Sequence, residues 1–386
     1  MVSVLLIIIY ITFISLGLPD ALLGAAWPVM HRDLQVDLSM AGIIALTISA
    51  GTVVASLLSD RLTIWLGTAK ITAISVGLTA MALFGFSVST SYWQLLLWSV
   101  PYGLGAGSVD ASLNNYVAIH YSSRCMSWLH CMWGIGASTG PYILGAALAE
   151  GMSWNAGYLY IALFQILLTC VLILSLPLWK PRQRAAEQAG SNTKPLTMKQ
   201  ILTIPGAKEI LIAFFCYCAA EQTAILWASS YFVLHNAVTE ELAASFGSLF
   251  LLGLTAGRAI SGFLSVKLND ANLIRLGQGI LVLGILVMLL PMGNMAGILG
   301  LLLMGLGCAP IYPCVIHSTP AHFGEQNSQA IIGVQMAAAY VGICTMPPLF
   351  GWIANSISVA LLPVYLALIT AMMIVMCERM NHKTAC

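Results

Sequence analysis

The sequence carries very little charge. Of its 386 residues, only 8% are Asp, Glu, Lys or Arg, whereas 59% are hydrophobic. A soluble chain usually contains about 25% charged residues, and it needs them to cover its surface. The formal net charge is +1, so no basic face is available for phosphate contacts. This composition excludes a soluble enzyme, a disordered chain and a nucleic-acid binder, and it indicates an integral membrane protein.

Paired cysteines of the kind that bind zinc or undergo thiol–disulfide chemistry are also missing. The chain contains ten cysteines, but none of them belongs to a CxxC motif. Cys216 and Cys218 are two residues apart and would not share a helix face. No nucleophile–base arrangement is evident along the chain either. We therefore expect no metal, no cofactor, no catalytic residues and no enzymatic activity.

Long hydrophobic runs make up most of the chain. A helix needs about 20 apolar residues to cross a hydrocarbon core that is about 30 Å thick. The runs are continuous, which favours helices, because the strands of a membrane barrel would alternate between apolar and polar residues. We predict an all-α integral membrane protein with twelve transmembrane helices over residues 3–30, 39–59, 71–89, 92–118, 125–149, 153–179, 207–235, 242–266, 276–292, 295–317, 327–354 and 357–377.

The longest polar stretch divides the chain into two halves. We predict a six-helix bundle in residues 1–179, a cytoplasmic linker in 180–206 and a second six-helix bundle in 207–386. If the N-terminus is cytoplasmic, every Lys and Arg except Arg32 falls on or near a cytoplasmic segment, as the positive-inside rule requires. We expect a multi-pass protein of the cell membrane, inner or plasma, with both termini in the cytoplasm.

The two halves repeat one another in sequence. Three matches occur in the same order: AGTVVASLLSDRL from Ala50 with AGRAISGFLSVKL from Ala256, GLGA from Gly103 with GLGC from Gly305, and GASTGP from Gly136 with GICTMP from Gly342. Parallel repeats of this kind build transporters whose site lies between the halves, near the middle of the membrane.

Three acidic residues lie deep in the predicted helices. Asp20, Asp110 and Glu221 each sit within an apolar run, where an ionisable group is costly and usually faces a cavity. We expect no basic residue at the same depth, so burial favours the protonated form of each carboxyl. We predict that these acids take up and release protons. The alternative is a protonated acid that only bonds one helix to another.

Polar and aromatic side chains accompany these acids. Asn114 follows Asp110 by one helical turn, so both can face one cavity. Amides and carboxylates bind hydroxyl groups at two points, and aromatic rings stack on the C–H face of a sugar. His130 is a proton relay, a donor to the solute or an interior histidine with a structural bond. The predicted solute-binding residues are Asp20, Asp110, Asn114, His130, Trp133, Glu221, Gln222, Trp227 and Tyr312.

The segment DRLTIWLGTAK, which follows the second predicted helix, resembles a signature of the major facilitator superfamily. The acid–arginine pair, the glycine and a basic residue of that signature are matched by Asp60, Arg61, Gly67 and Lys70, and one basic residue of the usual cluster is absent. The resemblance implies the fold of that superfamily, with two pseudo-symmetric six-helix bundles. It also implies that Asp60 and Arg61 take part in gating.

Within that superfamily the chain resembles the fucose–proton symporter family. Asp20 precedes a leucine-rich turn in the first helix, and the fourth helix carries GLGAGSVDASLNNY, with its acid at Asp110. The two acids of that family handle the proton and the sugar, so the resemblance implies these roles for Asp20 and Asp110. Glu221 with Trp227 is also similar to the related sodium-dependent glucose transporters.

We predict a secondary active transporter that works by alternating access and imports a small polar solute, such as a monosaccharide, together with protons. Na⁺ is the alternative coupling ion. The competing interpretation is proton-coupled export of drugs or apolar metabolites, with the same acids serving antiport. A third class, a non-transporting receptor, would ordinarily add a soluble signalling domain. The expected partners are the solute and the lipid bilayer, without nucleic acid, and we expect a monomer.

Overall fold

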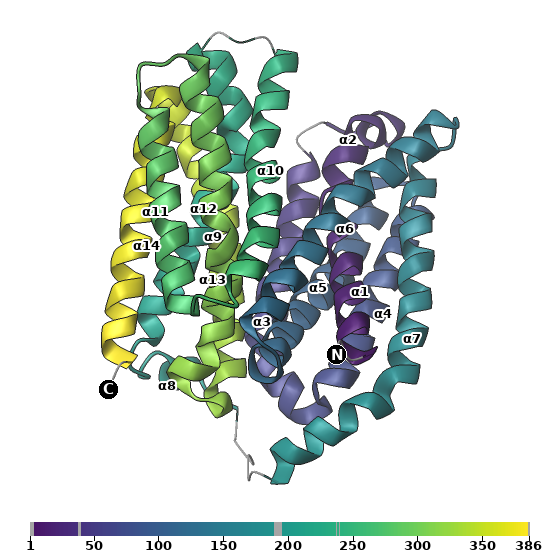
Figure 1. The fold of residues 1–386 in the computed structure, drawn as a ribbon. Helices are drawn as coiled ribbons and strands as arrows, with labels where there is room; N and C mark the ends of the chain where they lie inside the picture. Colours follow the sequence, from purple (N-terminus) through teal and green to yellow (C-terminus); the bar gives the residue numbers. More distant parts are fainter. Residues whose placement is uncertain (1–3, 38–39, 189–194, 237, 239, 385–386) are drawn as a thin grey trace. The chain divides into compact units, whose positions relative to one another are not determined.

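The computed structural model describes residues 4–37, 40–188, 195–236, 238 and 240–384, and that part of the chain is almost entirely helical, without a β-strand (Figure 1). The elements are α1 (Val4–Gly17), α2 (Leu22–Asp33), α3 (Ala41–Leu66), α4 (Thr68–Ser87), α5 (Tyr92–His120), α6 (Ser123–Ala149), α7 (Trp154–Gln188), α8 (Met198–Ile201), α9 (Ala207–Asn236), α10 (Glu240–Leu264), α11 (Asp270–Met288), α12 (Asn294–Phe323), α13 (Glu325–Ser356), a 3₁₀ turn (Val359–Leu361) and α14 (Leu362–Thr384).

The helices coincide with the predicted transmembrane segments. The first predicted span corresponds to α1 and α2 together, and the other eleven correspond in order to α3–α7 and α9–α14. By length and composition, nine spans of the described residues are apolar enough to cross a membrane. The helices α5, α6 and α10 are not among the nine, and α10 contributes only the shorter apolar segment Leu249–Leu264. Helices α5 and α6 are less hydrophobic because they carry polar residues, including Asp110, Asn114 and His130.

The chain forms two compact units. Unit 1 comprises Met1–Tyr116 and Leu129–Leu196, and unit 2 comprises Val117–Trp128 and Thr197–Cys386. The end of α5 and the start of α6 therefore belong with unit 2, whereas the rest of these helices belongs with unit 1. The predicted linker begins inside α7, and its residues 189–194 lie outside the described residues. The proposed boundaries of the two bundles remain a prediction.

In unit 1 the first predicted span is interrupted, so the expectation of one continuous helix over 3–30 is wrong. Between α1 and α2 the Asp20 N–H donates to the Gly17 carbonyl at 3.0 Å, and the Leu22 N–H donates to the Pro19 carbonyl at 3.1 Å. The physical reason is Pro19, which has no N–H to donate and disfavours a helical conformation in the residue before it. The interruption places Asp20 at a break in the helix.

The polar segment after the second predicted span is mostly helical instead of a loop. α3 continues to Leu66 and α4 starts at Thr68. Only Gly67 separates them, with φ +76°, a conformation that ends a helix and that glycine adopts without a steric penalty. Asp60 and Arg61 therefore lie on the last two turns of α3.

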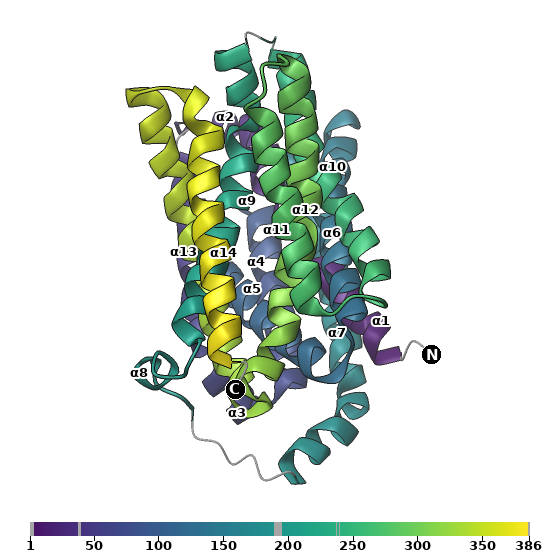
Figure 2. The same cartoon turned by 60° about the vertical axis from the view of Figure 1, so that its left-hand side comes forward.

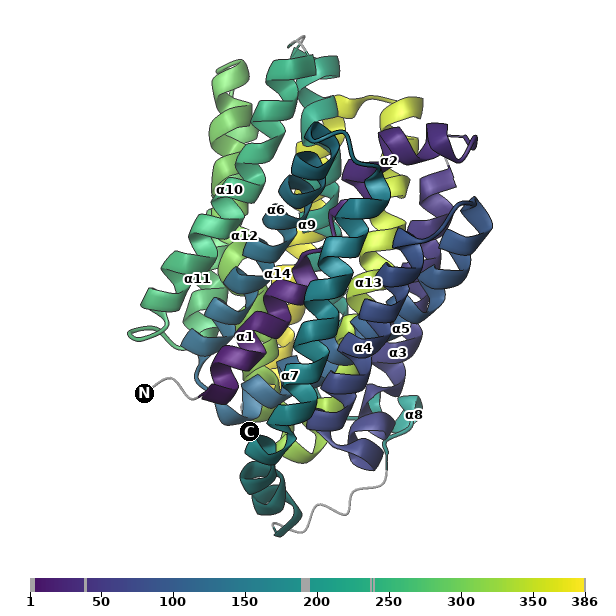
Figure 3. The same ribbon diagram turned by 90° about the vertical axis from the view of Figure 1, so that its right-hand side faces the viewer.

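Glycines of α6 allow it to pack closely against α1, which also lies beside α7 in unit 1 (Figure 3). A Cβ added at Gly136 would overlap the backbone carbonyl of Ile14, and one added at Gly140 would overlap that of Leu18. Small residues four apart let two backbones approach in this way in membranes. The contact brings α6 against the end of α1, directly before Asp20.

The internal repeat is visible as equivalent packing inside each unit. In unit 1, Gly103 of α5 lies against the backbone of Ile48 in α3. In unit 2, Gly305 of α12 lies against the backbone of Phe250 in α10, and α12 also packs against α11 (Figure 2). The fourth helix of each half therefore packs on the second helix of its own half through the same glycine of the GLG motif.

This packing corrects the register of one repeat. The sequence match from Ala50 and Ala256 equates Gly51 with Gly257. In the structure, Gly51 is three residues after Ile48 and Gly253 is three residues after Phe250, and each glycine lies against the glycine-containing helix of its own unit. Gly51 therefore corresponds to Gly253, one turn earlier than the sequence match. Helices rich in Gly, Ala and Leu carry the same residue types at every turn, so a sequence alignment can be wrong by one turn.

Large apolar side chains cover the outer surface of each unit. Trp65 and Leu174 are 79% and 80% exposed in unit 1, and Leu234 and Trp352 are 70% and 68% exposed in unit 2. Water would not tolerate apolar exposure on this scale, whereas lipid favours it. The exposed residues identify the lipid-facing sides of the helices.

Candidate functional site

The Asp20 carboxylate in unit 1 accepts hydrogen bonds from two aromatic residues. The Trp133 indole N–H donates to Oδ2 at 2.7 Å, and the Tyr102 hydroxyl donates to Oδ1 at 3.5 Å. These donors come from α6 and α5, while the Asp20 side chain remains accessible. An indole face beside an accessible carboxylate is a suitable surface for a polyhydroxylated ring.

Tyr102 was not singled out in the sequence. It lies eight residues before Asp110 on the same helix, which is a little over two helical turns, so the two side chains share a face. This spacing is the signal that could have identified it. Asp20 and Trp133 are 113 positions apart in the sequence, and this separation gave no comparable indication that the two side chains meet.

The second carboxyl of unit 1 belongs to a buried chain of polar groups. The Asn114 amide donates to Asp110 Oδ1 at 2.8 Å and to its backbone carbonyl at 3.0 Å. His130 Nε2 lies 3.1 Å from Asn114 Oδ1. Because an amide oxygen only accepts, this ring nitrogen carries the hydrogen. Asp110, Asn114 and His130 are 8%, 0% and 5% exposed, so water has almost no access to these three side chains.

The two carboxyls of unit 1 are close enough for the charge of Asp20 to act on Asp110. The four residues predicted on α5 and α6 thus gather in unit 1 together with Asp20. Trp133 belongs to the Asp20 group, and Asn114 and His130 belong to the Asp110 group. Tyr116, which follows Asn114 on the same helix, packs on Trp179 with ring centroids 4.8 Å apart.

In unit 2, Glu221 is joined to a buried tyrosine. The Tyr217 hydroxyl donates to the Glu221 carboxyl and lies 3.0 Å from the Cys308 carbonyl. One hydroxyl proton cannot serve both acceptors at full strength. Both contacts are satisfied when Glu221 is protonated and donates to Tyr217, whose own hydroxyl then donates to Cys308. The arrangement can therefore hold a proton on Glu221.

Arg258 changes the expected surroundings of Glu221. The side chain is only 4% exposed, and its charge acts on Tyr217 and on Cys308, the two groups on which Glu221 also acts. The expectation that no basic residue lies at the depth of the three acids is therefore wrong for Glu221. The sequence placed Arg258 near a cytoplasmic segment, because hydropathy alone does not fix the depth of a residue within its helix.

Tyr312 and Gln222, two further predicted binding residues, lie near the Glu221 group. Tyr312 packs on Tyr217 with ring centroids 6.0 Å apart, and its hydroxyl donates to the Met336 sulfur at 3.1 Å. Tyr312 comes seven residues after the first glycine of its GLG motif, as Asp110 does in unit 1. Gln222 is half-buried next to Glu221 in sequence.

Trp227 is engaged in helix packing. Its indole N–H donates to the Pro347 carbonyl at 3.0 Å, and its ring meets Phe350 edge-on with centroids 5.5 Å apart. Six residues separate it from Glu221, which turns the two side chains to different faces of α9. The structure therefore does not bring Trp227 to the Glu221 group.

The two predicted gating residues have different surroundings. The half-buried Asp60 carboxylate accepts a hydrogen bond from the Leu196 N–H at 3.2 Å, so it holds the chain that enters α8. Arg61 is exposed. Within the described residues, no group of three or more His, Cys, Asp or Glu side chains is placed to hold a metal ion.

Comparison with known proteins defines the class to which this fold and these sites belong. The family model described as Major Facilitator Superfamily matches residues 9–347. The chain belongs to this superfamily, and it is therefore a membrane transporter and not an enzyme.

Curated relatives are distant. The chain is 25% identical over 286 residues to Bypass of stop codon protein 6 of Saccharomyces cerevisiae, covering 67% of this chain but only 56% of that protein. It is 21% identical over 297 residues to the Glucose/mannose transporter GlcP of Bacillus subtilis, covering 75% of this chain and 72% of the transporter.

Solved structures share the whole fold. FucP, the fucose:proton symporter of E. coli, matches in its outward conformation with a TM-score of 0.81 at 14% identity, over 97% of this chain and 98% of FucP. The proton:xylose symporter XylE matches with a TM-score of 0.78 at 11% identity, over 97% and 94% of the two chains. At these identities the likeness establishes the fold alone.

Proposed function

We propose that the chain imports a small polar solute, such as a monosaccharide, together with protons. The observation that carries the proposal is the pair of carboxyls in unit 1. Asp20 is accessible and bonded to Trp133, whereas Asp110 is buried and bonded to Asn114. Ionisable groups at membrane depth are costly and are retained where they move ions or bind cargo.

The two carboxyls have different surroundings, and we assign them different roles. Asp20 binds solute hydroxyl groups, and the Trp133 indole supplies an apolar surface for the ring. Asp110 carries the proton, because its surroundings are dry and its neutral form costs least there. The charge of Asp20 acts on Asp110, so a solute that engages Asp20 changes the cost of ionising Asp110. This interaction couples the two events.

The names of similar proteins support a sugar as the solute. GlcP is described as a glucose/mannose transporter, FucP as a fucose:proton symporter and XylE as a proton:xylose symporter. We extend to this chain their common features, a monosaccharide and, for the last two, a proton. Na⁺ stays the alternative coupling ion. The protein acts as a monomer in the cell membrane with both termini in the cytoplasm, without any cofactor.

The second candidate is proton-coupled export of drugs or apolar metabolites. It would use the same carboxyls, since antiport needs an acid that exchanges a proton for cargo. The polar surroundings of both acids, with Asn114, His130 and Tyr102 as hydrogen-bonding partners, favour a hydroxylated cargo over an apolar one. An exporter would move its cargo against the direction of proton flow, which distinguishes the two functions.

The proposal is tested by transport in proteoliposomes. A thermal-shift screen of monosaccharides on purified protein first selects the solute, and uptake is then driven by an imposed pH gradient in sodium-free buffer. Asp110→Asn should abolish accumulation above the external concentration while retaining exchange of internal for external solute. Asp37→Asn, an exposed acid of unit 1, serves as the control and should accumulate normally. Unchanged accumulation by Asp110→Asn would show that Asp110 is not the coupling group.

A further inference from the structure

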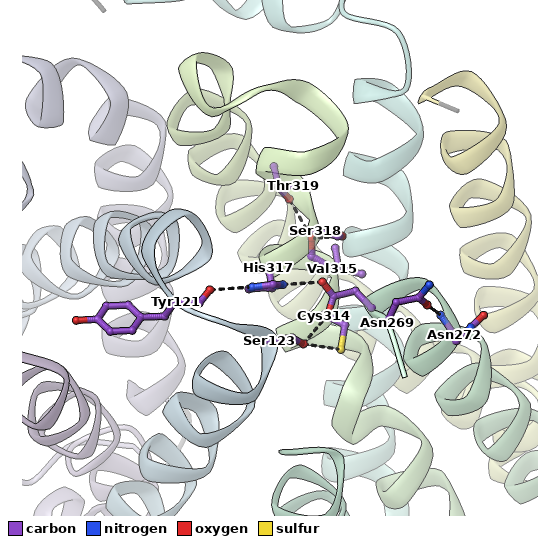
Figure 4. A network of polar contacts seen from close by, with 10 residues as sticks. Tyr121, Ser123, Asn269, Asn272, Cys314, Val315, His317, Ser318 and Thr319 are labelled. Atoms are coloured by element: carbon purple, nitrogen blue, oxygen red, sulfur yellow. Dashed lines mark hydrogen bonds and ion pairs between the residues drawn. The ribbon is translucent and has the colours of Figure 1, made fainter. Parts of the chain in front are cut away.

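A polar cluster in unit 2 lies outside the groups described above. It joins the turn between α5 and α6 to the beginning of α11 and to the last third of α12 (Figure 4). Its central residues are His317 and Asp270, which contact Tyr121 and Ser123. All four lie within unit 2, because Val117–Trp128 is grouped with it.

The histidine makes a hydrogen bond through each ring nitrogen. Nδ1 lies 2.6 Å from Asp270 Oδ2, and Nε2 lies 3.0 Å from the Tyr121 backbone carbonyl. The other carboxyl oxygen of Asp270 accepts from the Ser123 hydroxyl at 2.5 Å. The side chains of His317 and Asp270 are 19% and 16% exposed, so they are largely buried but remain within reach of water.

These contacts require one proton more than the separated groups carry. A carbonyl oxygen only accepts, so the Nε2 atom of His317 bears a hydrogen. A neutral imidazole has a single N–H, and its Nδ1 lone pair would then face an ionised carboxylate of Asp270 at 2.6 Å. The contact is favourable only with a proton between the two atoms, carried either by the imidazole or by the carboxyl. After loss of that proton, the single N–H of the neutral ring can serve either Asp270 or the Tyr121 carbonyl, but not both.

The other titratable groups near the pair do not take over this role. Cys314 of α12 lies 3.8 Å from the Ser123 hydroxyl. His322, five residues further along α12, is within range of the Asp270 charge, but its Nδ1 is bonded to the Thr384 hydroxyl at 2.8 Å. The ring of Tyr121 points away from His317, and only its backbone carbonyl takes part (Figure 4).

We propose that His317 and Asp270 form a proton-binding site that anchors residues 117–128 to α11 and α12. With the proton bound, the segment is held through the Tyr121 carbonyl and the Ser123 hydroxyl. Without it, one of the two His317 hydrogen bonds is lost, and the hold on the segment is weakened. Since the segment joins α5, which carries Asp110, to α6, which carries His130, protonation here controls the freedom of both helices. The site is independent of the solute carried.

The test is hydrogen exchange of the backbone amides in residues 117–128 of the purified full-length protein. Rates are measured from about pH 5.5 to about pH 8.5, the range in which histidine titrates, and are corrected for intrinsic exchange. We expect protection to fall as pH rises, by up to about tenfold per pH unit, the limit for a contact that needs one proton. Peptides of α4 should show no such slope.

Three variants complete the test. His317→Phe should show low protection at every pH. Asp270→Asn should stay protected at every pH, because its amide donates to Nδ1 without an added proton. His382→Gln, at an exposed histidine of α14, should behave as the parent protein. The proposal is overturned if the parent protein shows no slope in this segment beyond that of α4, or if either His317→Phe or Asp270→Asn keeps the parental slope.

Discussion

At the scale of single residues, hydrogen-bond donors determine which carboxyls of this transporter can hold a proton. Asp20 accepts hydrogen bonds from Trp133 and Tyr102, and these contacts are complete without a proton on the acid. Glu221 shares the single hydroxyl of Tyr217 with the Cys308 carbonyl, and this arrangement is complete only when the acid supplies a proton of its own. The same reasoning about donors applies to His317 and Asp270.

The Tyr217 hydroxyl gives a prediction about stability. Tyr217→Phe removes the hydroxyl that the Glu221 carboxyl and the Cys308 carbonyl share, and we expect a loss of about 1–3 kcal/mol, the usual cost of leaving such groups without a partner. Glu221→Gln keeps an acceptor and a donor at the same place, so its loss should be smaller. The melting temperature of the purified protein in detergent should be highest for the parent, lower for Glu221→Gln and lowest for Tyr217→Phe. Equal melting of Tyr217→Phe and the parent would contradict the shared-hydroxyl arrangement.

Sequence spacing predicted some of these contacts and not others. Asn114 lies one turn from Asp110, and its hydrogen bond to that acid is what the helical period predicts. The bond between Trp133 and Asp20 and the approach of Arg258 to Tyr217 join different helices. They depend on how the helices pack, and spacing along the chain contains no information about that. Roles for all of these residues remain predictions.

At the scale of secondary-structure elements, the position of Asp20 depends on two features. Pro19 interrupts the helix, and the glycines of α6 bring Trp133 close enough to donate to the acid. The contacts of these glycines with the backbone of Ile14 and Leu18 show this close approach. The interruption was missed, because the hydrophobic run continues through the proline without a polar residue other than Asp20.

The glycine contact between α1 and α6 gives a matched pair of variants. Gly140→Ala places a methyl group against the Leu18 carbonyl, which belongs to backbone and cannot rotate away. We expect a loss of about 1–3 kcal/mol in stability from overpacking, together with a loss of solute binding as Trp133 moves from Asp20. Gly145→Ala lies on the same helix, where an added Cβ meets no atom within 4 Å. It should be neutral or stabilising by up to about 1 kcal/mol.

Thermal melting and solute-induced thermal shifts of the two α6 variants are the measurements that check this. If both alanine variants melt and bind the solute alike, close contact between α1 and α6 does not position the site.

At the scale of the whole molecule, the scarcity of charge made the fold predictable. Twelve apolar runs, one polar stretch and a repeated GLG motif predicted two halves of six membrane helices each, because each helix must satisfy its own backbone in lipid. The superfamily fold was implied by the resemblance of DRLTIWLGTAK to a known signature. The predicted loop over 60–70 was wrong, since helix α3 continues beyond its apolar run. Hydropathy shows where the apolar run of a helix stops. The helix itself continues until a residue such as Gly67 ends it.

The distribution of basic residues gives a prediction about orientation. In a variant without native cysteines, Ser153→Cys lies in the turn between α6 and α7, and Gln326→Cys lies at the start of α13; both positions are exposed. With the N-terminus in the cytoplasm, a membrane-impermeant maleimide added to intact cells should label Ser153→Cys and not Gln326→Cys. After permeabilisation both should react. The opposite pattern would reverse the orientation.

The central claim is that solute and proton cross the membrane together. The most direct measurement is the external pH of a weakly buffered suspension of proteoliposomes when the solute is added without any imposed gradient. We expect the medium to become more alkaline as the solute enters, and a protonophore should abolish the change. Entry of the solute with no change in external pH, or with acidification, would contradict proton symport.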